Sequence, residues 1–391
     1  MRVIGLMSGT SLDGVDAALV RLDGDAPEWR VEAFVAHPYP AERRERIHAA
    51  IQEGGAPELC RLHTALGEWF AEAALAACAA AGVAADAVDL IGSHGQTVWH
   101  EPPAPEWRGS TLQMGCPATI AERTGIPVVS DFRARDTAAG GEGAPLVPWV
   151  DRLLFSHPER RRVLQNIGGM ANLTRVPRRG EDAPLLAFDT GPGIALVDAA
   201  VELATGGERV FDEDGRWAAR GQVDEALLEE LLAHPFLHRA PPKSTGRETF
   251  GRPMVARLAE RFTGGGEPRW KDLVATLTEL TARSIADAVR RWVLPEGADE
   301  LIVTGGGARN PELVRRIATA LDPLPVRTAD ALGLDPEAKE AVAFAVLGWA
   351  FVRERAGNVP EATGARGPRV LGSFTPGAAA RGMRPLGVPG S

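Results

Sequence analysis

The sequence predicts an α/β protein built from two similar domains that face a common cleft. Its 391 residues exceed the size at which one hydrophobic core stops growing, so two domains of about 150 to 200 residues are expected. β-Prone segments alternate with amphipathic helical segments, as they do in α/β sheets. One order of elements, strand, glycine turn, strand, strand and helix, also occurs twice along the chain.

The first copy begins at the N-terminus. RVIGLM and VDAALVRL are apolar and β-prone, and the turn-rich SGTSLDG between them predicts a hairpin. A third strand is expected next, at 29–36, followed by two helices at 41–53 and 57–81. Two short strands at 89–93 and 127–131 then flank a helix that begins at Pro117.

The second copy begins near Arg161. RVLQNIGG predicts a strand that enters a glycine turn, and NLTRVP and LLAFD predict two more strands before a helix over 194–203. A long apolar helix is expected over 273–292, followed by a buried strand at 300–304.

Asn310 and Pro311 mark the start of another helix. Asn310 can provide an N-cap oxygen and Pro311 lacks an amide hydrogen, so the helix should run from there through Leu321. The tail after Ala356 is rich in Gly, Pro and Arg, and we expect it to be loose.

Composition excludes several classes of function. A net charge of −9 argues against a general nucleic-acid partner, because phosphate neutralisation requires an excess of Lys and Arg. Cys60, Cys78 and Cys116 form no CxxC pair and no disulfide framework, which fits a reducing compartment or simple packing. The apolar run from Val3 to Met7 is too short for a signal-peptide core or a membrane span. We therefore expect a cytoplasmic protein with no nucleic-acid or membrane partner.

Glycine-bearing turns leave predicted strands at 7–14, 166–174 and 304–310. Each alone could serve only to allow positive φ. Together they fit bare backbone that approaches a polyphosphate from two hairpins, with a purine over the third turn. The chain has no GxxxxGK[ST] motif, which disfavours a P-loop fold.

Polar side chains in the first turn support the same interpretation. The hydroxyls of Ser8, Thr10 and Ser11 would donate to phosphate oxygens, and Asp13 or Asp16 could hold magnesium through water. A plain hairpin tip is the alternative for this turn.

Eight segments, in order from residue 4 to about 349, resemble the anhydro-N-acetylmuramic acid kinase family: GLMSGTSLDGVDAALV, GSHGQT, STLQMG, DFRARDTAAGGEGAPLVP, LQNIGGMANLT, FDTGPG, KSTGRETFG and VTGGGARN. The resemblance implies two ribonuclease-H-like domains of the actin and sugar-kinase superfamily around a nucleotide cleft. The expected domains are 1–140, completed by the C-terminal helix and tail at about 338–375, and 141–337. One departure is Glu142, where we expect glutamine in the family's GGQGAP.

The resemblance implies a kinase that uses ATP with Mg²⁺ and water. It would open the ring of 1,6-anhydro-N-acetylmuramic acid and phosphorylate the 6-oxygen, giving N-acetylmuramate 6-phosphate in peptidoglycan recycling. A base must activate the water while the bridge oxygen leaves toward the γ-phosphate. Asp189 in FDTGPG matches the family's base, and an Asx-turn aspartate is the alternative. The resemblance also points to a homodimer, while the residues themselves leave the oligomeric state open.

The resemblance extends to nucleotide contacts. The segment that matches the ATP-phosphate region comprises Gly9, Thr10, Ser11, Leu12, Asp13, Gly14, Val15 and Asp16. The other expected nucleotide contacts are Gly168, Gly169, Gly305, Gly306, Gly307 and Asn310. The residues that would bind the metal ion are not assigned.

The expected substrate contacts are His94, Gln96, Thr97, Arg133, Asp136 and Glu340. Arg133 could pair with the lactyl carboxylate of the sugar, although Asp131 and Asp136 could instead hold it as an ion pair. Glu340 either faces the site or merely favours its helix N-terminus. The segment 243–250 has no assigned role. The rival functions are a kinase of the same superfamily for another sugar or small carboxylate, and a non-catalytic ATP-binding module.

Overall fold

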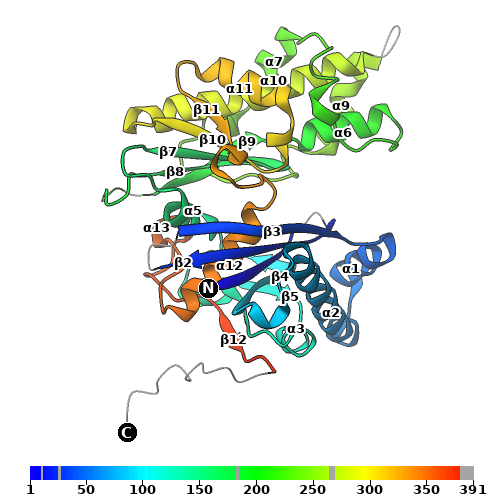
Figure 1. The fold of residues 1–391 in the computed structure, drawn as a ribbon. Coiled ribbons are helices and arrows are strands. Elements are labelled where there is room, and N and C mark those ends of the chain that lie inside the picture. The colour runs from blue at the N-terminus through cyan, green and yellow to red at the C-terminus, as the bar shows by residue number, and fades with distance from the viewer. Residues whose placement is uncertain are drawn as a thin grey trace. The chain divides into compact units, whose positions relative to one another are not determined.

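The computed structural model describes residues 1–9, 12–24, 28–104, 106–181, 183, 185–263 and 269–378. The chain divides into two compact units, one formed by Met1–Leu154 with Ala338–Ser391 and the other by Phe155–Glu337 (Figure 1). The first unit thus extends to Leu154, beyond the boundary at 140 that we expected for the first domain. Residues 141–154 belong to the first unit, where the Asp151 carboxylate forms a buried ion pair of 3.0 Å with Lys339.

The first unit is built on a mixed sheet in the order β12-β6-β4-β1-β2-β3, with β5 paired to β4. Its strands are β1 (Arg2–Ser8), β2 (Gly14–Asp23), β3 (Glu28–Pro38), β4 (Leu90–Glu101), β5 (Ser110–Met114), β6 (Val128–Ser130) and β12 (Ser373–Thr375). β1, β2 and β3 are antiparallel, whereas β4 pairs with β1 and with β6 in parallel. The predicted hairpin and third strand are thus confirmed.

The second unit repeats this arrangement in a sheet of order β11-β10-β7-β8-β9. Its strands are β7 (Arg162–Ile167), β8 (Met170–Val176), β9 (Leu186–Pro192), β10 (Glu300–Thr304) and β11 (Val326–Thr328). β7, β8 and β9 are antiparallel, and β10 runs parallel to both β7 and β11. Three antiparallel strands followed by two parallel ones, in the same spatial order in both units, is the ribonuclease-H-like topology that the family resemblance implied.

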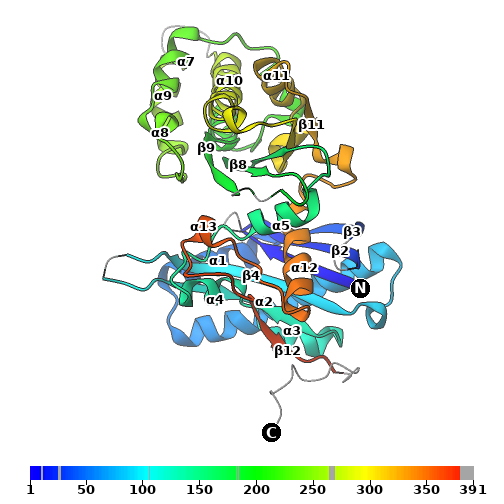
Figure 2. The ribbon, with the colours of Figure 1, turned by 90° about the vertical axis from the view of Figure 1, so that its left-hand side faces the viewer.

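Helices cover both faces of the first sheet. They are α1 (Ala41–Glu53), α2 (Ala56–Ala81), α3 (Pro117–Thr124), α4 (Phe132–Ala138), α5 (Val147–Phe155), α12 (Lys339–Val352) and α13 (Pro360–Thr363). Ile4 and Ile91 pack in one core with α2, while their neighbours Gly5 and Gly92 meet the backbone of α12. Since successive strand residues point to opposite faces, α2 and α12 lie on opposite sides of the sheet (Figure 2).

The helices of the second unit form two apolar clusters, both of which include α10. They are α6 (Ala195–Ala204), α7 (Glu225–Leu232), α8 (Pro235–His238), α9 (Arg252–Thr263), α10 (Trp270–Ala288) and α11 (Pro311–Leu321). The Asn310 side chain accepts a hydrogen bond from the Leu313 amide at 3.0 Å, so the predicted N-cap of α11 is confirmed.

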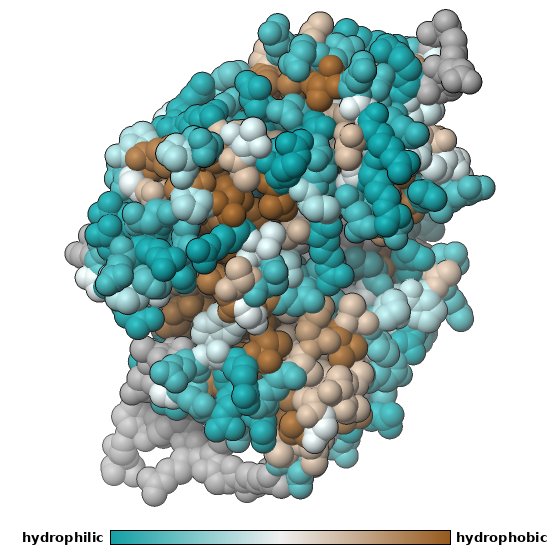
Figure 3. Space-filling model, turned by 45° about the horizontal axis from the view of Figure 1, so that its top comes forward, coloured by the Kyte–Doolittle hydropathy of each residue, from teal (hydrophilic) through white to brown (hydrophobic). Residues whose placement is uncertain are grey.

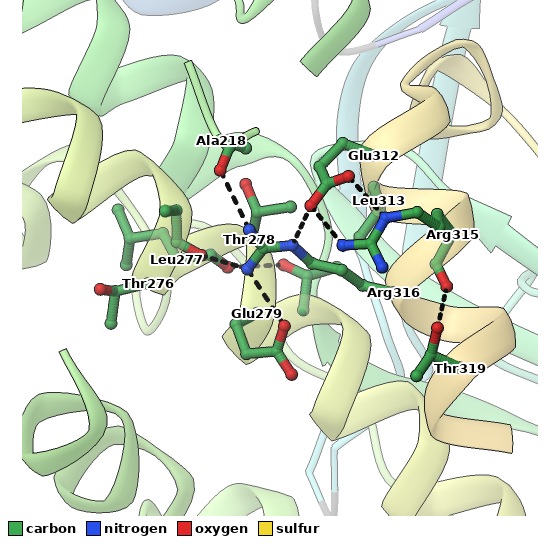
Figure 4. A network of polar contacts seen from close by, with 12 residues as sticks. Ala218, Thr276, Leu277, Thr278, Glu279, Glu312, Leu313, Arg315, Arg316 and Thr319 are labelled. Carbon is green, nitrogen blue, oxygen red and sulfur yellow. Dashed lines mark hydrogen bonds and ion pairs between the residues drawn. The ribbon is translucent and has the colours of Figure 1, made fainter. Parts of the chain in front are cut away.

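A buried arginine fixes α11 on α10 (Figure 4). Arg316 Nε donates to Glu312 at 2.8 Å, and its Nη atoms donate to the Ala275 carbonyl at 2.9 Å, to Glu279 at 3.1 Å and to the Ala218 carbonyl at 3.0 Å. Because α11 follows directly on the third glycine turn, this network also holds that turn in place.

The C-terminal segment differs from expectation. We predicted a loose tail after Ala356, but residues 357–378 pack on the first unit, where β12 pairs with β6 and Asn358 and Thr363 are buried. The reason is a set of polar contacts to Asp136, described below, that composition does not reveal. The predicted strand at 89–93 is also longer, since β4 continues to Glu101.

Polar residues dominate the face shown in Figure 3, where apolar residues lie in scattered groups. None of the helices in the described part of the chain has the length and hydropathy to cross a bilayer.

Candidate active site

The first glycine turn connects β1 to β2 and is held by a buried glutamine. The Gln96 side chain accepts from Ser8 Oγ at 2.6 Å and donates from Nε2 to the Gly9 carbonyl at 2.9 Å. Leu12 has a positive φ of 56°, and Asp13 is exposed at the tip. Thr10 and Ser11 lie outside the described residues. Gln96, expected at the sugar, therefore has its amide engaged with the first turn.

A neutral histidine orients Arg133. His94 is buried, its Nδ1 lies 2.8 Å from the Gly95 carbonyl, and its Nε2 accepts from Arg133 Nε at 2.9 Å. Burial and the neighbouring guanidinium hold the pKa of His94 well below its usual value, so Nδ1 carries the proton. Arg133 Nη1 donates to the Gly143 carbonyl at 2.9 Å. Burial lowers the pKa of Arg133, and the carboxylate of Glu340 opposes this effect.

The other expected substrate residues of the first unit are dispersed. Asp136 is fully buried and accepts hydrogen bonds from the Gly143 amide and from the side chains of Asn358 and Thr363. Among the described residues neither Asp131 nor Asp136 forms an ion pair with Arg133. The Thr97 hydroxyl lies 3.5 Å from Gln113 Nε2, a long contact. Glu340 stands in the first turn of α12.

A cavity of about 620 Å³ lies beside α4 in the first unit. Its lining includes the exposed guanidinium groups of Arg108 and Arg366, together with the hydroxyls of Ser110, Thr111 and Thr137. Within the described residues neither arginine has an acidic partner. The cavity is therefore both positively charged and rich in hydroxyl groups.

In the second unit, two of the glycine turns lie together. The Gly168 and Gly169 carbonyls accept from the Ile194 and Gly193 amides at 2.9 Å each, which ties the β7–β8 turn to the start of α6. A Cβ atom placed on Gly305 would lie 2.8 Å from the Ile167 carbonyl oxygen, so the third turn approaches the end of β7 closely. Both turns expose bare backbone at the same end of the sheet.

Asp189 projects from β9 beside the segment 243–250, to which the sequence assigned no role. Its Oδ2 accepts from the Thr245 amide at 2.9 Å, and its own amide donates to the Lys243 carbonyl at 3.0 Å. Burial raises the pKa of Asp189, while the Thr245 amide and the Lys243 charge act in the opposite direction. Across the described residues its Oδ1 accepts no hydrogen bond. One carboxylate oxygen is thus anchored and the other is free to take a proton.

Lys243 and Arg247 are residues that sequence reasoning did not single out. Lys243 Nζ donates to the Phe236 and Leu237 carbonyls at 3.2 Å each, and burial lowers its pKa to about 8. Arg247 lies against Gly169, since a Cβ atom there would be 3.4 Å from Arg247 Nη2. The sequence did contain a signal for them, because the polar segment KSTGRETF holds both cations around a central glycine.

Arg247 also faces Asp198 in the first turn of α6. Burial raises the pKa of Asp198 to about 7, an effect that Arg247 opposes and Asp212 reinforces. Among the described residues no group of three or more His, Cys, Asp or Glu side chains has the arrangement of a metal site.

Two ribonuclease-H-like units, with glycine turns at the ends of their strands, are the architecture of the actin and sugar-kinase superfamily. The particular family follows from comparison of the sequence with known proteins. The model of the family "Anhydro-N-acetylmuramic acid kinase" matches residues 1–377, and the chain belongs to this family. It is therefore an ATP-dependent kinase.

Two curated relatives carry the family name over nearly their whole length. The anhydro-N-acetylmuramic acid kinase of Cyanothece sp. is 46% identical over 385 residues, covering 96% of this chain and 99% of its own. That of Caldanaerobacter subterraneus is 44% identical over 382 residues, covering 95% of this chain and 96% of its own. Among solved structures, the activator of the 2-hydroxyisocaproyl-CoA dehydratase from Clostridium difficile is 14% identical over 89% of this chain and 94% of its own, with a TM-score of 0.43.

Proposed function

We propose that the protein opens the anhydro ring of 1,6-anhydro-N-acetylmuramic acid with water and transfers the γ-phosphoryl group of ATP to the 6-oxygen. The observation that carries this proposal is the state of Asp189: one oxygen anchored by the Thr245 amide, the other free, and a pKa raised by burial. A base with these properties suits abstraction of a proton from water.

In the proposed reaction the water oxygen forms a bond to the anomeric carbon while the bond from that carbon to the bridge oxygen breaks. The released 6-oxygen forms a bond to the γ-phosphorus, and the bond between this phosphorus and the β,γ-bridging oxygen breaks to release ADP. The proton from water passes to Asp189 and then to solvent. The products are N-acetylmuramate 6-phosphate and ADP.

The glycine turns would bind the nucleotide. The backbone of 9–16, Gly168, Gly169 and Gly305–Gly307 would approach the phosphates and purine, with Asn310 beside the third turn. Arg247, which lies against Gly169, adds a guanidinium that would pair with phosphate oxygens. Magnesium would spread the charge of the phosphates, and the exposed carboxylate of Asp13, or Asp16 on β2, would hold it through water.

The sugar would contact Arg133, Thr97 and Glu340. His94, Gln96 and Asp136 would instead hold the residues and loops that carry these contacts, because their polar atoms are already engaged within the chain.

The lactyl carboxylate has two candidate partners, Arg133 and the cavity pair Arg108 and Arg366. The test compares 1,6-anhydro-N-acetylmuramic acid with 1,6-anhydro-N-acetylglucosamine, which lacks the lactyl group. One variant replaces Arg133 and the other replaces Arg108 and Arg366. The variant that raises KM for the muramic sugar but not for the glucosamine sugar identifies the partner of the lactyl carboxylate. If Arg133→Lys raises KM for both sugars, Arg133 recognises another part of the sugar.

We also propose that the protein is cytoplasmic and forms a homodimer. Within each chain, each of the two units would act as one domain. The three cysteines are free, which fits a reducing compartment. Family resemblance supports the dimer, and sedimentation velocity tests it.

The decisive experiment measures ADP release with MgATP and 1,6-anhydro-N-acetylmuramic acid, with N-acetylmuramic acid and N-acetylglucosamine as parallel acceptors. We expect turnover with the anhydro sugar alone, a 6-phosphate product, and loss of activity in EDTA. Turnover only with another acceptor would contradict the anhydro-sugar proposal, and no turnover with any of the three would contradict catalysis of this reaction.

A further inference from the structure

Asp136 is a fully buried carboxylate held by three donors from distant parts of the chain. Its Oδ1 accepts from Asn358 Nδ2 at 2.7 Å and from Thr363 Oγ1 at 2.9 Å. Its Oδ2 accepts from the Gly143 amide at 2.9 Å. A buried carboxyl group with this many donors stabilises one arrangement of its neighbours, because each lost donor leaves a buried acceptor unpaired.

The loop 139–143 is shaped around this carboxylate. A Cβ atom on Gly141 would lie 2.2 Å from Asp136 Oδ2, so the loop reaches this position only without a side chain there. Gly143 has a positive φ of 73°, and a Cβ atom on it would lie 2.6 Å from Thr137 Oγ1. The contact with Asp136 therefore determines where the Gly143 carbonyl points.

The Gly143 carbonyl is the direct link to Arg133. It accepts from Arg133 Nη1 at 2.9 Å, while Arg133 Nε donates to His94 at 2.9 Å. These two acceptors hold the guanidinium plane from two sides. Asp136 thus acts on Arg133 through a single intervening residue.

The C-terminal segment clamps the same loop from outside. The Glu142 amide donates to the Thr363 carbonyl at 2.7 Å, and the Arg366 amide donates to the Ala139 carbonyl at 3.0 Å. Asn358 Oδ1 accepts from the Arg369 amide at 2.7 Å, which fixes the side chain that donates to Asp136.

We propose that Asn358 and Thr363 are positioning residues for the sugar site, because they hold Asp136, which aligns the Gly143 carbonyl and through it the Arg133 guanidinium. This inference rests on the proposed contact between Arg133 and the sugar. It gives the C-terminal segment a specific task, namely to set the orientation of a binding residue that lies more than 200 positions earlier in the chain.

The test uses Thr363→Val, which keeps the shape and removes the hydroxyl, with Thr363→Ser as the matched control. We expect Thr363→Val to raise KM for the anhydro sugar about tenfold, the effect of one buried acceptor left short of a hydrogen bond. KM for ATP should stay unchanged, and Thr363→Ser should restore the sugar KM. Asn358→Ala provides an independent second variant, and each variant leaves Asp136 two of its three donors.

A double-mutant cycle with Arg133→Lys separates the two proposals. If Arg133 is the target, Thr363→Val should have little further effect on the sugar KM once Arg133 is replaced. A normal sugar KM in folded Thr363→Val and Asn358→Ala, or an equal rise for sugar and ATP, would overturn the positioning role. An unchanged sugar KM in Arg133→Lys alone would instead contradict the proposed contact of Arg133 with the sugar.

Discussion

A carboxylate such as Asp189 acquires its chemistry from the groups around it. Burial disfavours its charge, whereas the Thr245 amide and the Lys243 cation favour it. The balance leaves a raised pKa, which makes the group a better proton acceptor than an exposed aspartate. At the scale of single residues, this environment provides two predictions.

Asp189→Asn should lower kcat by a factor of about 10² to 10⁴, the usual contribution of a general base. The amide is nearly isosteric and its oxygen still accepts from the Thr245 amide, so ATP affinity should be retained. Steady-state kinetics and calorimetric ATP titration measure the two effects, with the exposed Asp287→Asn as control. A normal kcat in Asp189→Asn would remove the proposed base.

Lys243→Met should move the acidic limb of the kcat/KM profile to higher pH. The base must be ionised, so activity falls as the pH drops through the pKa of Asp189. Lys243, whose pKa is about 8, is charged in this range and lowers the pKa of Asp189. Removal of the cation raises that pKa, and loss of activity then begins at a higher pH. Initial rates between about pH 4 and pH 8 test this. An acidic limb that stays in place or moves to lower pH would contradict it.

At the scale of elements, glycines determine how closely α12 approaches the first sheet. A Cβ atom on Gly5 would lie 1.8 Å from the Ala341 carbonyl oxygen, and one on Gly92 would lie 2.1 Å from that of Phe344. Since both obstacles are helix backbone, no side-chain rotation relieves them.

We therefore expect Gly92→Ala to destabilise the first unit by about 2 kcal/mol, as overpacking does in other cores. The measurement is urea unfolding monitored by hydrogen exchange of β1 and β4. Gly55→Ser is the matched control, because Gly55 is an exposed N-cap whose Cβ atom would make only an ordinary contact of 3.8 Å with Pro57 Cδ. Equal stability of the two variants would contradict the close approach of helix and sheet.

At the scale of the whole molecule, the first unit is discontinuous in sequence and the second is continuous. Since α12 is almost entirely buried and comes from beyond residue 337, a fragment of 1–154 lacks the cover of one sheet face.

The fragment 1–154 alone should therefore fail to unfold cooperatively, and addition of a second fragment, 338–391, should restore a cooperative transition. The fragment 155–337 should fold alone. Circular dichroism during thermal unfolding distinguishes these outcomes, and a sharp transition in isolated 1–154 would show that α12 is dispensable.

Local patterns in the sequence were sufficient for much of the fold. The alternation of apolar residues predicted β1 to β3, the period of helices predicted α1 and α2, and the cap signals of Asn310 and Pro311 located α11. The repeated order of elements indicated two similar domains, because each ribonuclease-H-like unit starts with the same strands and turn. Strands, helices and caps depend mainly on residues close together in the sequence, so a short stretch of sequence is enough to predict them.

Tertiary structure decided which of the polar residues meet. Asp136 and Thr363 are 227 positions apart, and Ser8 and Gln96 are 88 apart, so no local pattern predicts their hydrogen bonds. The same holds for the packed C-terminal segment and for Lys243, which reaches Asp189 only because a loop returns to β9. The physical reason is that a buried polar group takes whichever partner the packing of the elements brings within hydrogen-bonding distance.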